Sequence, residues 1–309
     1  MTTLLLTHPS SLNHVTPPGH PERVQRYASV MSALQADRFD ALIRREAPMG
    51  ARDEILRCHP ESYLTRIEAA IPGDGLRSLD ADTHVSPGSL EPAMRAVGGC
   101  CAAVDAVLAG EATNAFVAMR PPGHHAETST AMGFCLFGNV SIAAKRALDH
   151  HGLARVAVID FDVHHGNGTQ DLLWNESRAM FCSSQQMPLY PGSGAAHETG
   201  AHGQIVNVPL DPMSGGAEMR AAYDTVIFPA VQEFKPEMIL ISAGFDAHQD
   251  DPLANLNWTT DDFAWVTRRI CEIGDHLCDG RIVSTLEGGY DLDALADSVA
   301  VHVEALMAA

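Results

Sequence analysis

The sequence predicts a single-domain α/β fold, with a mainly parallel central sheet of about eight strands and helices on both faces. Two observations lead to this prediction. Short apolar runs rich in β-branched residues alternate along the chain with longer amphipathic segments, which is the pattern of strand–helix–strand units. No linker, low-complexity tract or internal repeat interrupts this alternation, so we expect residues 1–309 to form one domain. A hydrophobic fraction of 46% supplies a large core.

The expected strands are apolar runs of the kind that fill the middle of a parallel sheet. They lie at Thr3–Thr7, Ala115–Met119, Val156–Ile159, Ala179–Ser184, Ile205–Leu210, the run that starts at Met238 and ends at Asp246, and Ile282–Leu286. Helices are expected at about Arg23–Gln35, 60–70, a segment capped by Ser89 and ending near Ala109, Asn139–His151, Gly216–Phe234, a segment from Thr259 or Thr260 to Cys278, and the C-terminal segment after Tyr290.

Charge and cysteine content narrow the class of protein. The net charge is −19 and the 20 Lys and Arg residues form no basic run, which argues against nucleic acid or an anionic membrane as partner and mildly favours cationic substrates. The seven cysteines are scattered without a CxxC pair, as in reduced cytosolic proteins, so a cytoplasmic location is expected. Neither a signal peptide nor a membrane-spanning run is expected.

Charged side chains continue directly from the strand that begins at Val156. Asp160, Asp162 and His164 share one face of the extended chain, and burying them is costly unless a metal ion compensates their charge. The strand that begins at Met238 also ends in a carboxylate, Asp246. Two carboxylates and one imidazole leave metal positions open for water and substrate, which is the catalytic pattern for zinc.

Two further strands end in groups suited to acid–base chemistry. His124 and His125 follow a Pro-Pro-Gly turn after the strand at 115–119, and they are candidates for proton transfer. Tyr290 follows a Gly-Gly pair and is a candidate hydrogen-bond donor to an oxyanion. Parallel strands bring these ends to one edge of the sheet, where open α/β sheets bind ligands. Together the groups predict hydrolysis of an amide-like bond by metal-activated water.

Other histidines and acids are expected outside this centre. His8, His14 and His20 are too dispersed for a compact site, so we expect structural or rim roles. The Asp80, Asp82 and His84 cluster has metal-like spacing, but no buried strand precedes it. We therefore expect Asp82 at the surface or at the rim of the substrate site.

Five motifs in order, RPPGHH, GFC, DFDVHHGNGTQ, SAGFDAHQDDPL and LEGGY, resemble the zinc-dependent histone deacetylase family, closer to its class II and bacterial members, within the arginase/deacetylase fold. The similarity runs from the loop at 19–23 to Tyr290. It implies that Asp162, His164 and Asp246 bind one zinc ion. It further implies that His125 is the general base and then acid, that His124 acts electrostatically, and that Tyr290 polarises the acyl carbonyl.

The resemblance also implies supporting residues. Asp160 should hold His124, and Asn167, which is Asp in class I members, should face His125. Phe134 and Tyr190 match the walls of the acyl-lysine channel, although the second is usually Phe. Gly133 and Leu253 are further expected channel residues, with Asp82 at the rim. The resemblance also implies a structural potassium or sodium ion at Asp160, Ser183 and Ser184 with the main chain of Asp162 and His164. Gln185 stands where relatives usually have His.

Three alternatives to an acetyl-lysine deacetylase remain at this point. An acetylpolyamine amidohydrolase shares the chemistry; Leu253 after Asp251-Pro252 favours lysine-type substrates, whereas the net charge suits cationic amines of either kind. A binuclear ureohydrolase on the same fold would need ligands for a second metal, and Gly166 follows His165 instead. A non-catalytic acyl-lysine binding module would have lost a ligand, a histidine or the tyrosine. The substrate and any homo-oligomer remain open.

Overall fold

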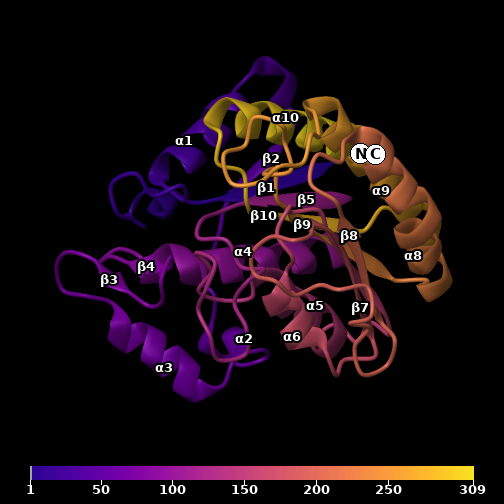
Figure 1. Ribbon diagram of the computed structural model, residues 1–309. Coiled ribbons are helices and arrows are strands. Elements are labelled where there is room, and N and C mark those ends of the chain that lie inside the picture. The colour runs from indigo at the N-terminus through magenta and orange to yellow at the C-terminus, as the bar shows by residue number, and fades with distance from the viewer. Residues whose placement is uncertain (1) are drawn as a thin grey trace.

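The structure, a computed structural model, describes residues 2–309 and is built on one sheet of eight parallel strands (Figure 1). This confirms the expected fold. The strand order is β2-β1-β5-β10-β9-β6-β7-β8. The strands are β1 (Thr3–Thr7), β2 (Ile43–Glu46), β5 (Asn114–Ala118), β6 (Val156–Asp160), β7 (Ala179–Gln186), β8 (Ile205–Leu210), β9 (Met238–Ala243) and β10 (Ile282–Leu286).

Helices cover both faces of the sheet, as Figure 1 shows. One face carries α1 (Val24–Ala33), α7 (Gly216–Ala222), α8 (Phe228–Phe234), α9 (Thr260–Cys278) and α10 (Leu292–Ala308); the other carries α4 (Leu90–Leu108), α5 (Asn139–Asp149) and α6 (Asn167–Leu173). Successive strand residues point to opposite sides, so Ile159 and Ile241 join the first core and Val158 and Leu240 the second.

A smaller unit lies beside α4. It contains α2 (Arg52–Ile55), α3 (Glu61–Ala70) and an antiparallel hairpin of β3 (Arg77–Ser78) with β4 (His84–Val85), and it has its own apolar cluster. Short 3₁₀ turns occur at Pro9–Leu12 and Asp37–Phe39. His84, for which we expected no buried strand nearby, therefore begins a short strand of this hairpin.

Four local expectations need correction. β2 and α6 were not predicted, because β2 is a largely exposed edge strand and α6 begins within a Gly-Asn-Gly sequence. The helix expected at 216–234 contains a π-helical turn at Tyr223–Ile227. Ser89 does not cap α4; its hydroxyl instead accepts from the Ser86 amide and bonds His14 Nδ1. Thr259 does occupy the N-cap position of α9, where the Asp262 carboxylate accepts from both its amide and its hydroxyl.

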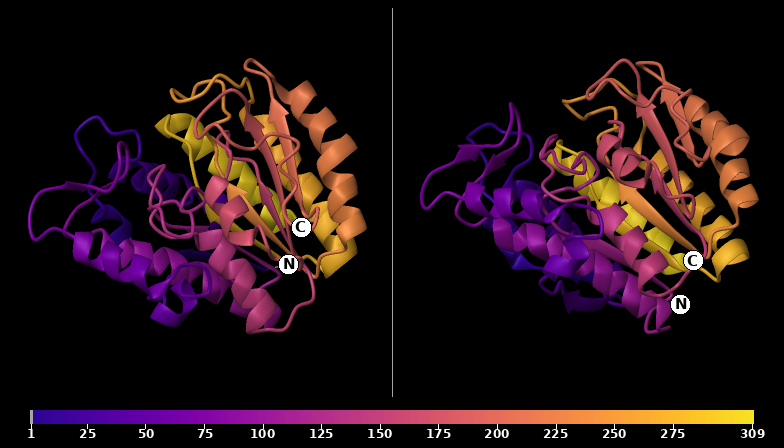
Figure 2. Two further views of the ribbon diagram at one scale, coloured as in Figure 1. Left: turned by 60° about the horizontal axis from the view of Figure 1, so that its bottom comes forward. Right: turned by 90° about the horizontal axis from the view of Figure 1, so that it is seen from below.

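The carboxyl ends of the strands carry the loops with the polar motifs, and both chain ends lie away from them (Figure 2). The end of α10 is fixed at the opposite side of the sheet, where the strands begin. There the carbonyl of Leu306 accepts from Thr3 Oγ1 and Asn114 Nδ2 at the starts of β1 and β5. In the part of the chain that the structure describes, no helix combines the length and apolar character needed to span a bilayer.

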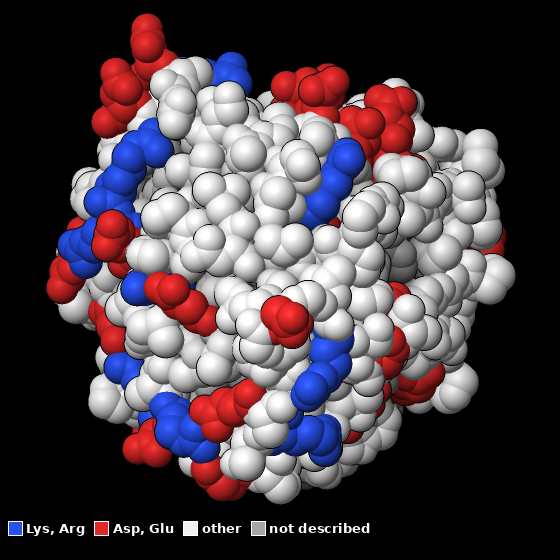
Figure 3. Space-filling view, turned by 90° about the vertical axis from the view of Figure 1, so that its left-hand side faces the viewer, with Lys and Arg blue, Asp and Glu red and all other residues white. Residues whose placement is uncertain are grey.

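The surface mixes charges of both signs. On the face shown in Figure 3, basic residues lie singly or beside acidic ones around a broad uncharged area. Several basic side chains are ion-paired, such as Arg45 with Glu111 and Arg38 with Glu304. This face therefore presents no continuous basic stripe.

Candidate active site

Asp162, His164 and Asp246 meet at the carboxyl edge of the sheet. They come together because β6 and β9 are paired neighbours and each strand runs directly into its ligand-bearing loop. His164 Nδ1 lies 3.2 Å from Asp162 Oδ1 and 3.1 Å from Asp246 Oδ2. Their candidate ligand atoms all lie within 4.8 Å of one another, and all three residues are buried.

Backbone groups orient the two carboxylates. The Gly288 amide donates to Asp162 Oδ2 at 2.9 Å, and the Val163 amide donates to Asp246 Oδ1 at 2.9 Å. A Cβ atom at Gly244 or Gly288 would overlap the Asp162 or Asp246 carboxylate. The glycines therefore let the main chain approach the carboxylates closely enough to fix their orientation.

The charge balance of this cluster suits a bound cation. Across residues 2–309, neither Asp162 nor Asp246 forms an ion pair with Lys or Arg, so histidines are their ion-pair partners. Burial opposes protonation of His164, but the two carboxylates raise its pKa to about 10. Two carboxylates and an imidazole directed at one point therefore fit a divalent metal ion.

His124 and His125 follow β5 on a turn held by Glu287. The Glu287 carboxylate accepts from the amides of Gly123 at 2.6 Å and His124 at 3.1 Å, which fastens the end of β10 to the turn after its neighbour β5. Behind the rings, His124 Nδ1 lies 3.0 Å from Asp160 Oδ2 and His125 Nδ1 lies 2.7 Å from Asn167 Oδ1. The two contacts that the resemblance implied are both present.

The environments of the two histidines separate their pKa values. Burial opposes protonation of His124, yet the carboxylates of Asp162 and Asp160 raise its pKa well above the usual range. Burial and the positive charges of His124 and His164 hold the pKa of His125 well below the usual range. His125 is therefore the neutral member of the pair, with Nε2 free to accept a proton.

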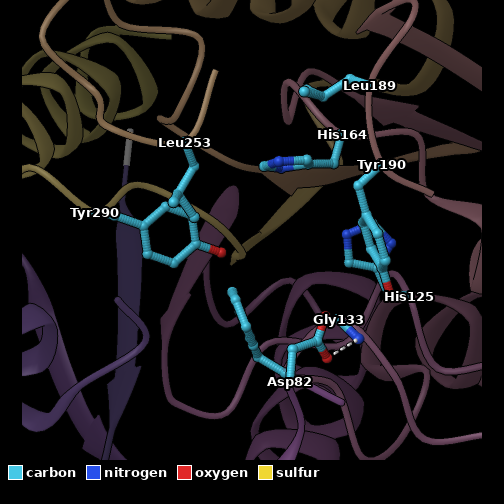
Figure 4. Close-up of a pocket in the computed structure, with 9 residues that line it drawn as sticks. Asp82, His125, Gly133, His164, Leu189, Tyr190, Leu253 and Tyr290 are labelled. Atoms are coloured by element: carbon cyan, nitrogen blue, oxygen red, sulfur yellow. Dashed lines mark hydrogen bonds between the residues drawn. The ribbon is translucent and has the colours of Figure 1, made fainter. Parts of the chain in front are cut away.

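Tyr290 lies across the cavity from His125, and its hydroxyl points into the cavity (Figure 4). The Asp251 carboxylate accepts from the Tyr290 amide at 2.6 Å, and the Arg26 guanidinium lies over the ring at 4.8 Å from its centroid. Arg26 also donates to the carbonyls of Glu287 and Gly289. Burial raises the pKa of Tyr290 well above its usual range, so the phenol remains a hydrogen-bond donor.

A cavity of about 260 Å³ leads to this centre. It brings together all five residues expected to line a substrate channel, with two of the catalytic candidates and one metal-ligand candidate (Figure 4). The lining residues are Asp82, His125, Gly133, Phe134, His164, Leu189, Tyr190, Leu253 and Tyr290. Leu189 was not predicted, although it precedes Tyr190 in the same Pro-bounded loop.

The wall formed by Gly133 and Phe134 has an unusual backbone, with φ of 55° and 68°. Asp82 and Thr83 support it: Asp82 Oδ1 accepts from the Gly133 amide at 3.2 Å, and Thr83 Oγ1 accepts from the Phe134 amide at 3.0 Å. Behind it, His20 bonds the Asp82 carbonyl. Asp82 also lines the cavity itself.

The residues expected around a monovalent ion lie on β6 and β7, and one of them, Asp160, contacts His124. Asp160 and Ser183 are paired in register on β6 and β7, whereas the Ser184 side chain faces the other side of the sheet. The hydroxyls of both serines have protein partners, Gln185 Oε1 at 2.8 Å and the Tyr223 hydroxyl at 2.9 Å. Gln185 also donates to the Gly194 carbonyl and so supports the loop of Tyr190. An ion at this place stays a prediction.

The chain is similar to known proteins in both sequence and structure. The model of the histone deacetylase domain matches residues 20–306. A probable deacetylase from Archaeoglobus fulgidus is 38% identical over 100% of this chain and 87% of its own length. A histone deacetylase-like amidohydrolase from Pseudomonas aeruginosa is 39% identical over 89% of this chain and 74% of its own length. The crystal structure of the HDA15 HD domain is similar with a TM-score of 0.94 and 29% identity, over 100% of this chain and 89% of that one.

Proposed function

The chain belongs to the histone deacetylase family and is a hydrolase of amide bonds, and from this premise we propose that it is a zinc-dependent deacetylase of N-acetylated amines. The observation that carries the proposal is the joint position of three groups around one cavity. The Asp162, His164 and Asp246 cluster, the neutral His125 and the hydroxyl of Tyr290 all border the space that a substrate carbonyl would enter.

Each residue has a defined task in this proposal. Asp162, His164 and Asp246 would hold zinc, which when bound supplies Lewis acidity toward the amide carbonyl and toward water. His125 Nε2 accepts the proton of the attacking water and then returns it to the leaving amine. Tyr290 donates a hydrogen bond to the carbonyl oxygen as negative charge develops there. His124, held between Asp160 and Asp162, adds fixed positive charge beside the reacting atoms.

The residues that line the channel favour a substrate that carries its acyl group at the end of a slender alkyl chain. Phe134, Tyr190, Leu189 and Leu253 give it apolar walls, and Asp82 adds an acidic group at the rim. We propose acetyl-lysine in a peptide or protein as the substrate. Acetylpolyamines are the second candidate, supported by the net charge of −19. A potassium or sodium ion near Asp160 and Ser183 and a cytoplasmic location complete the proposal.

Metal analysis and a substrate panel test the proposal. Purified protein should contain about one transition-metal equivalent per chain, and two equivalents would favour a binuclear ureohydrolase instead. The kcat/KM for acetyl-lysine peptides should exceed that for acetylpolyamines. A preference for acetylpolyamines of more than about tenfold, or ~1.4 kcal/mol, would reverse the substrate assignment. Metal-loaded protein without turnover on any acylated amine would favour a binding module.

A further inference from the structure

The carboxamide of Asn167 lies between His125 and a carboxylate that the proposed mechanism does not use. Its Oδ1 is 2.7 Å from His125 Nδ1, and its Nδ2 donates to Glu127 Oε1 at 2.8 Å. The Sδ atom of Met132 lies 3.4 Å from the same nitrogen. Asn167 is 7% exposed, and Glu127 is half-buried at the edge of the site. His125, Asn167 and Glu127 thus form one hydrogen-bonded row.

The orientation of this carboxamide decides which nitrogen of His125 carries the proton. The oxygen of an asparagine side chain only accepts hydrogen bonds, and its nitrogen only donates them. With Oδ1 toward the ring, Nδ1 must be protonated and Nε2 keeps the lone pair that faces the cavity. A carboxamide turned by 180° would present its NH₂ group to Nδ1, and the proton would then occupy Nε2, where a general base must be unprotonated.

Glu127 distinguishes these two orientations. A carboxylate accepts hydrogen bonds and donates none, so it pairs with the Asn167 NH₂ group and disfavours its oxygen. An aspartate at position 167 would need no such partner, because its two oxygens are equivalent. The requirement for Glu127 therefore follows from the amide at position 167.

The position of Glu127 relative to Asn167 is itself fixed. Glu127 and Thr130 exchange backbone hydrogen bonds and close a tight turn. The amide and hydroxyl of Thr128 both donate to Asp171 Oδ2, at 2.8 and 2.6 Å. Asp171 lies on α6, one turn beyond Asn167, so the helix that carries the carboxamide also anchors the turn that carries Glu127.

We propose that Glu127 is a positioning residue that fixes the carboxamide of Asn167 and thereby holds His125 in the tautomer with Nε2 unprotonated. The proposal rests on the proposed function, in which His125 is the general base.

A double-mutant cycle on the metal-loaded enzyme tests the proposal. Glu127→Ala should lower kcat about two- to fivefold, because kcat falls in proportion to the fraction of enzyme whose Nε2 is unprotonated, and should leave KM within about twofold. Glu127→Gln keeps an acceptor for the Asn167 NH₂ group and should retain more activity than Glu127→Ala. Glu233→Ala, at an exposed glutamate on α8, is the matched control and should have no effect.

The decisive readout is whether Glu127→Ala raises or lowers kcat when Asn167 has already been replaced by Asp. In that background two carboxylates face each other, so adding Glu127→Ala should raise kcat above that of Asn167→Asp alone. If Glu127→Ala lowered kcat by the same factor in the wild-type and Asn167→Asp proteins, Glu127 would have a merely structural role and the proposal would be overturned. A wild-type kcat in Glu127→Ala would also overturn it.

Nitrogen-15 NMR of the His125 ring separates this inference from the proposed function. Wild-type protein should show a protonated Nδ1, and Glu127→Ala should show a mixture of tautomers. That pattern in a protein without deacetylase turnover would support the positioning role and refute the function. The same tautomer in both proteins would refute the positioning role whatever the turnover.

Discussion

At the scale of a residue, the hydroxyl group of Tyr290 can be removed without changing the packing of its ring. Tyr290→Phe keeps the ring between Phe134 and Arg26 but removes the hydroxyl that points into the cavity. We expect kcat to fall by about 10²–10³-fold, the usual loss for one oxyanion donor, while metal content stays at the wild-type value. Turnover with metal analysis checks this, and near-normal turnover would remove Tyr290 from the mechanism.

Gly133 gives a second prediction at this scale. A Cβ at this position would lie 2.6 Å from Cγ of His125, and the backbone φ of 55° also disfavours a side chain. Gly133→Ala should therefore displace His125, the proposed general base, and lower kcat about 10²-fold. Gly110→Ala is the control, since φ is 72° there but the space is open. The positive φ should cost both variants about 1–2 kcal/mol of stability, with a further loss in Gly133→Ala from the overlap with His125, and an equal loss of activity in both would contradict the prediction.

Motif residues of the site could be predicted one by one, because Asp162, His164 and Asp246 directly follow apolar strands. Their partners could not be predicted in the same way. Glu127 and Asp251 act through loops whose conformations bring together residues about forty positions apart, and no local pattern in the sequence reports such a contact.

At the scale of elements, Asp251 joins the loops that follow β9 and β10. Its carboxylate accepts from the amides of Leu253, Tyr290 and Asp291, so one buried side chain sets two walls of the cavity. Asp251→Asn places an NH₂ group against one set of these donors and should cost about 1–3 kcal/mol of stability, with a fall in kcat. Urea unfolding and turnover measure both effects. Asp250→Asn, at the exposed neighbour, should change neither; equal effects of the two variants would contradict the linking role.

Strand prediction succeeded where largely apolar residues form the strand. The bounds of β1, β8 and β10 agree with the expected ranges. β1 and β10 are internal strands with apolar side chains on both faces, and the edge strand β8 still has the largely apolar sequence Ile-Val-Asn-Val-Pro-Leu. β2 has the sequence Ile-Arg-Arg-Glu and lies at an exposed edge, so its pairing with β1 leaves no apolar signature. The sequence predicts Ser89 as a helix cap, but its hydroxyl bonds His14 instead, in a contact between residues far apart in the chain.

At the scale of the whole molecule, buried neutral histidines link stability to pH. Burial lowers the pKa of His59 and His165 to about 4 and that of His302 to about 3. Below an unfolded pKa of about 6.5 the unfolded chain binds protons that the fold does not, so the free energy of unfolding decreases as the pH falls from there toward the folded values. Each histidine contributes a slope of up to about 1.4 kcal/mol per pH unit.

His302 allows a clean test because its ring lies between the hydroxyls of Thr267 and Ser284 and makes no hydrogen bond with the Asp162, His164 and Asp246 cluster. His302→Gln should reduce the slope of unfolding free energy against pH by up to about 1.4 kcal/mol per unit between pH 6 and 4. Urea titrations at several pH values measure the slope. His276→Gln, at an exposed histidine of α9, should leave it unchanged, and an unchanged slope in His302→Gln would contradict the assignment.

The place of β10 in the sheet has a consequence for synthesis on the ribosome. This strand is the last of the eight in the sequence, yet it lies between β5 and β9. Until residues 282–286 leave the exit tunnel, the nascent chain can pair only two separate half-sheets, each with an unsatisfied edge open to aggregation. The same segment brings Glu287, Gly288 and Tyr290 to the site, so the pocket closes only after β10 has joined the sheet.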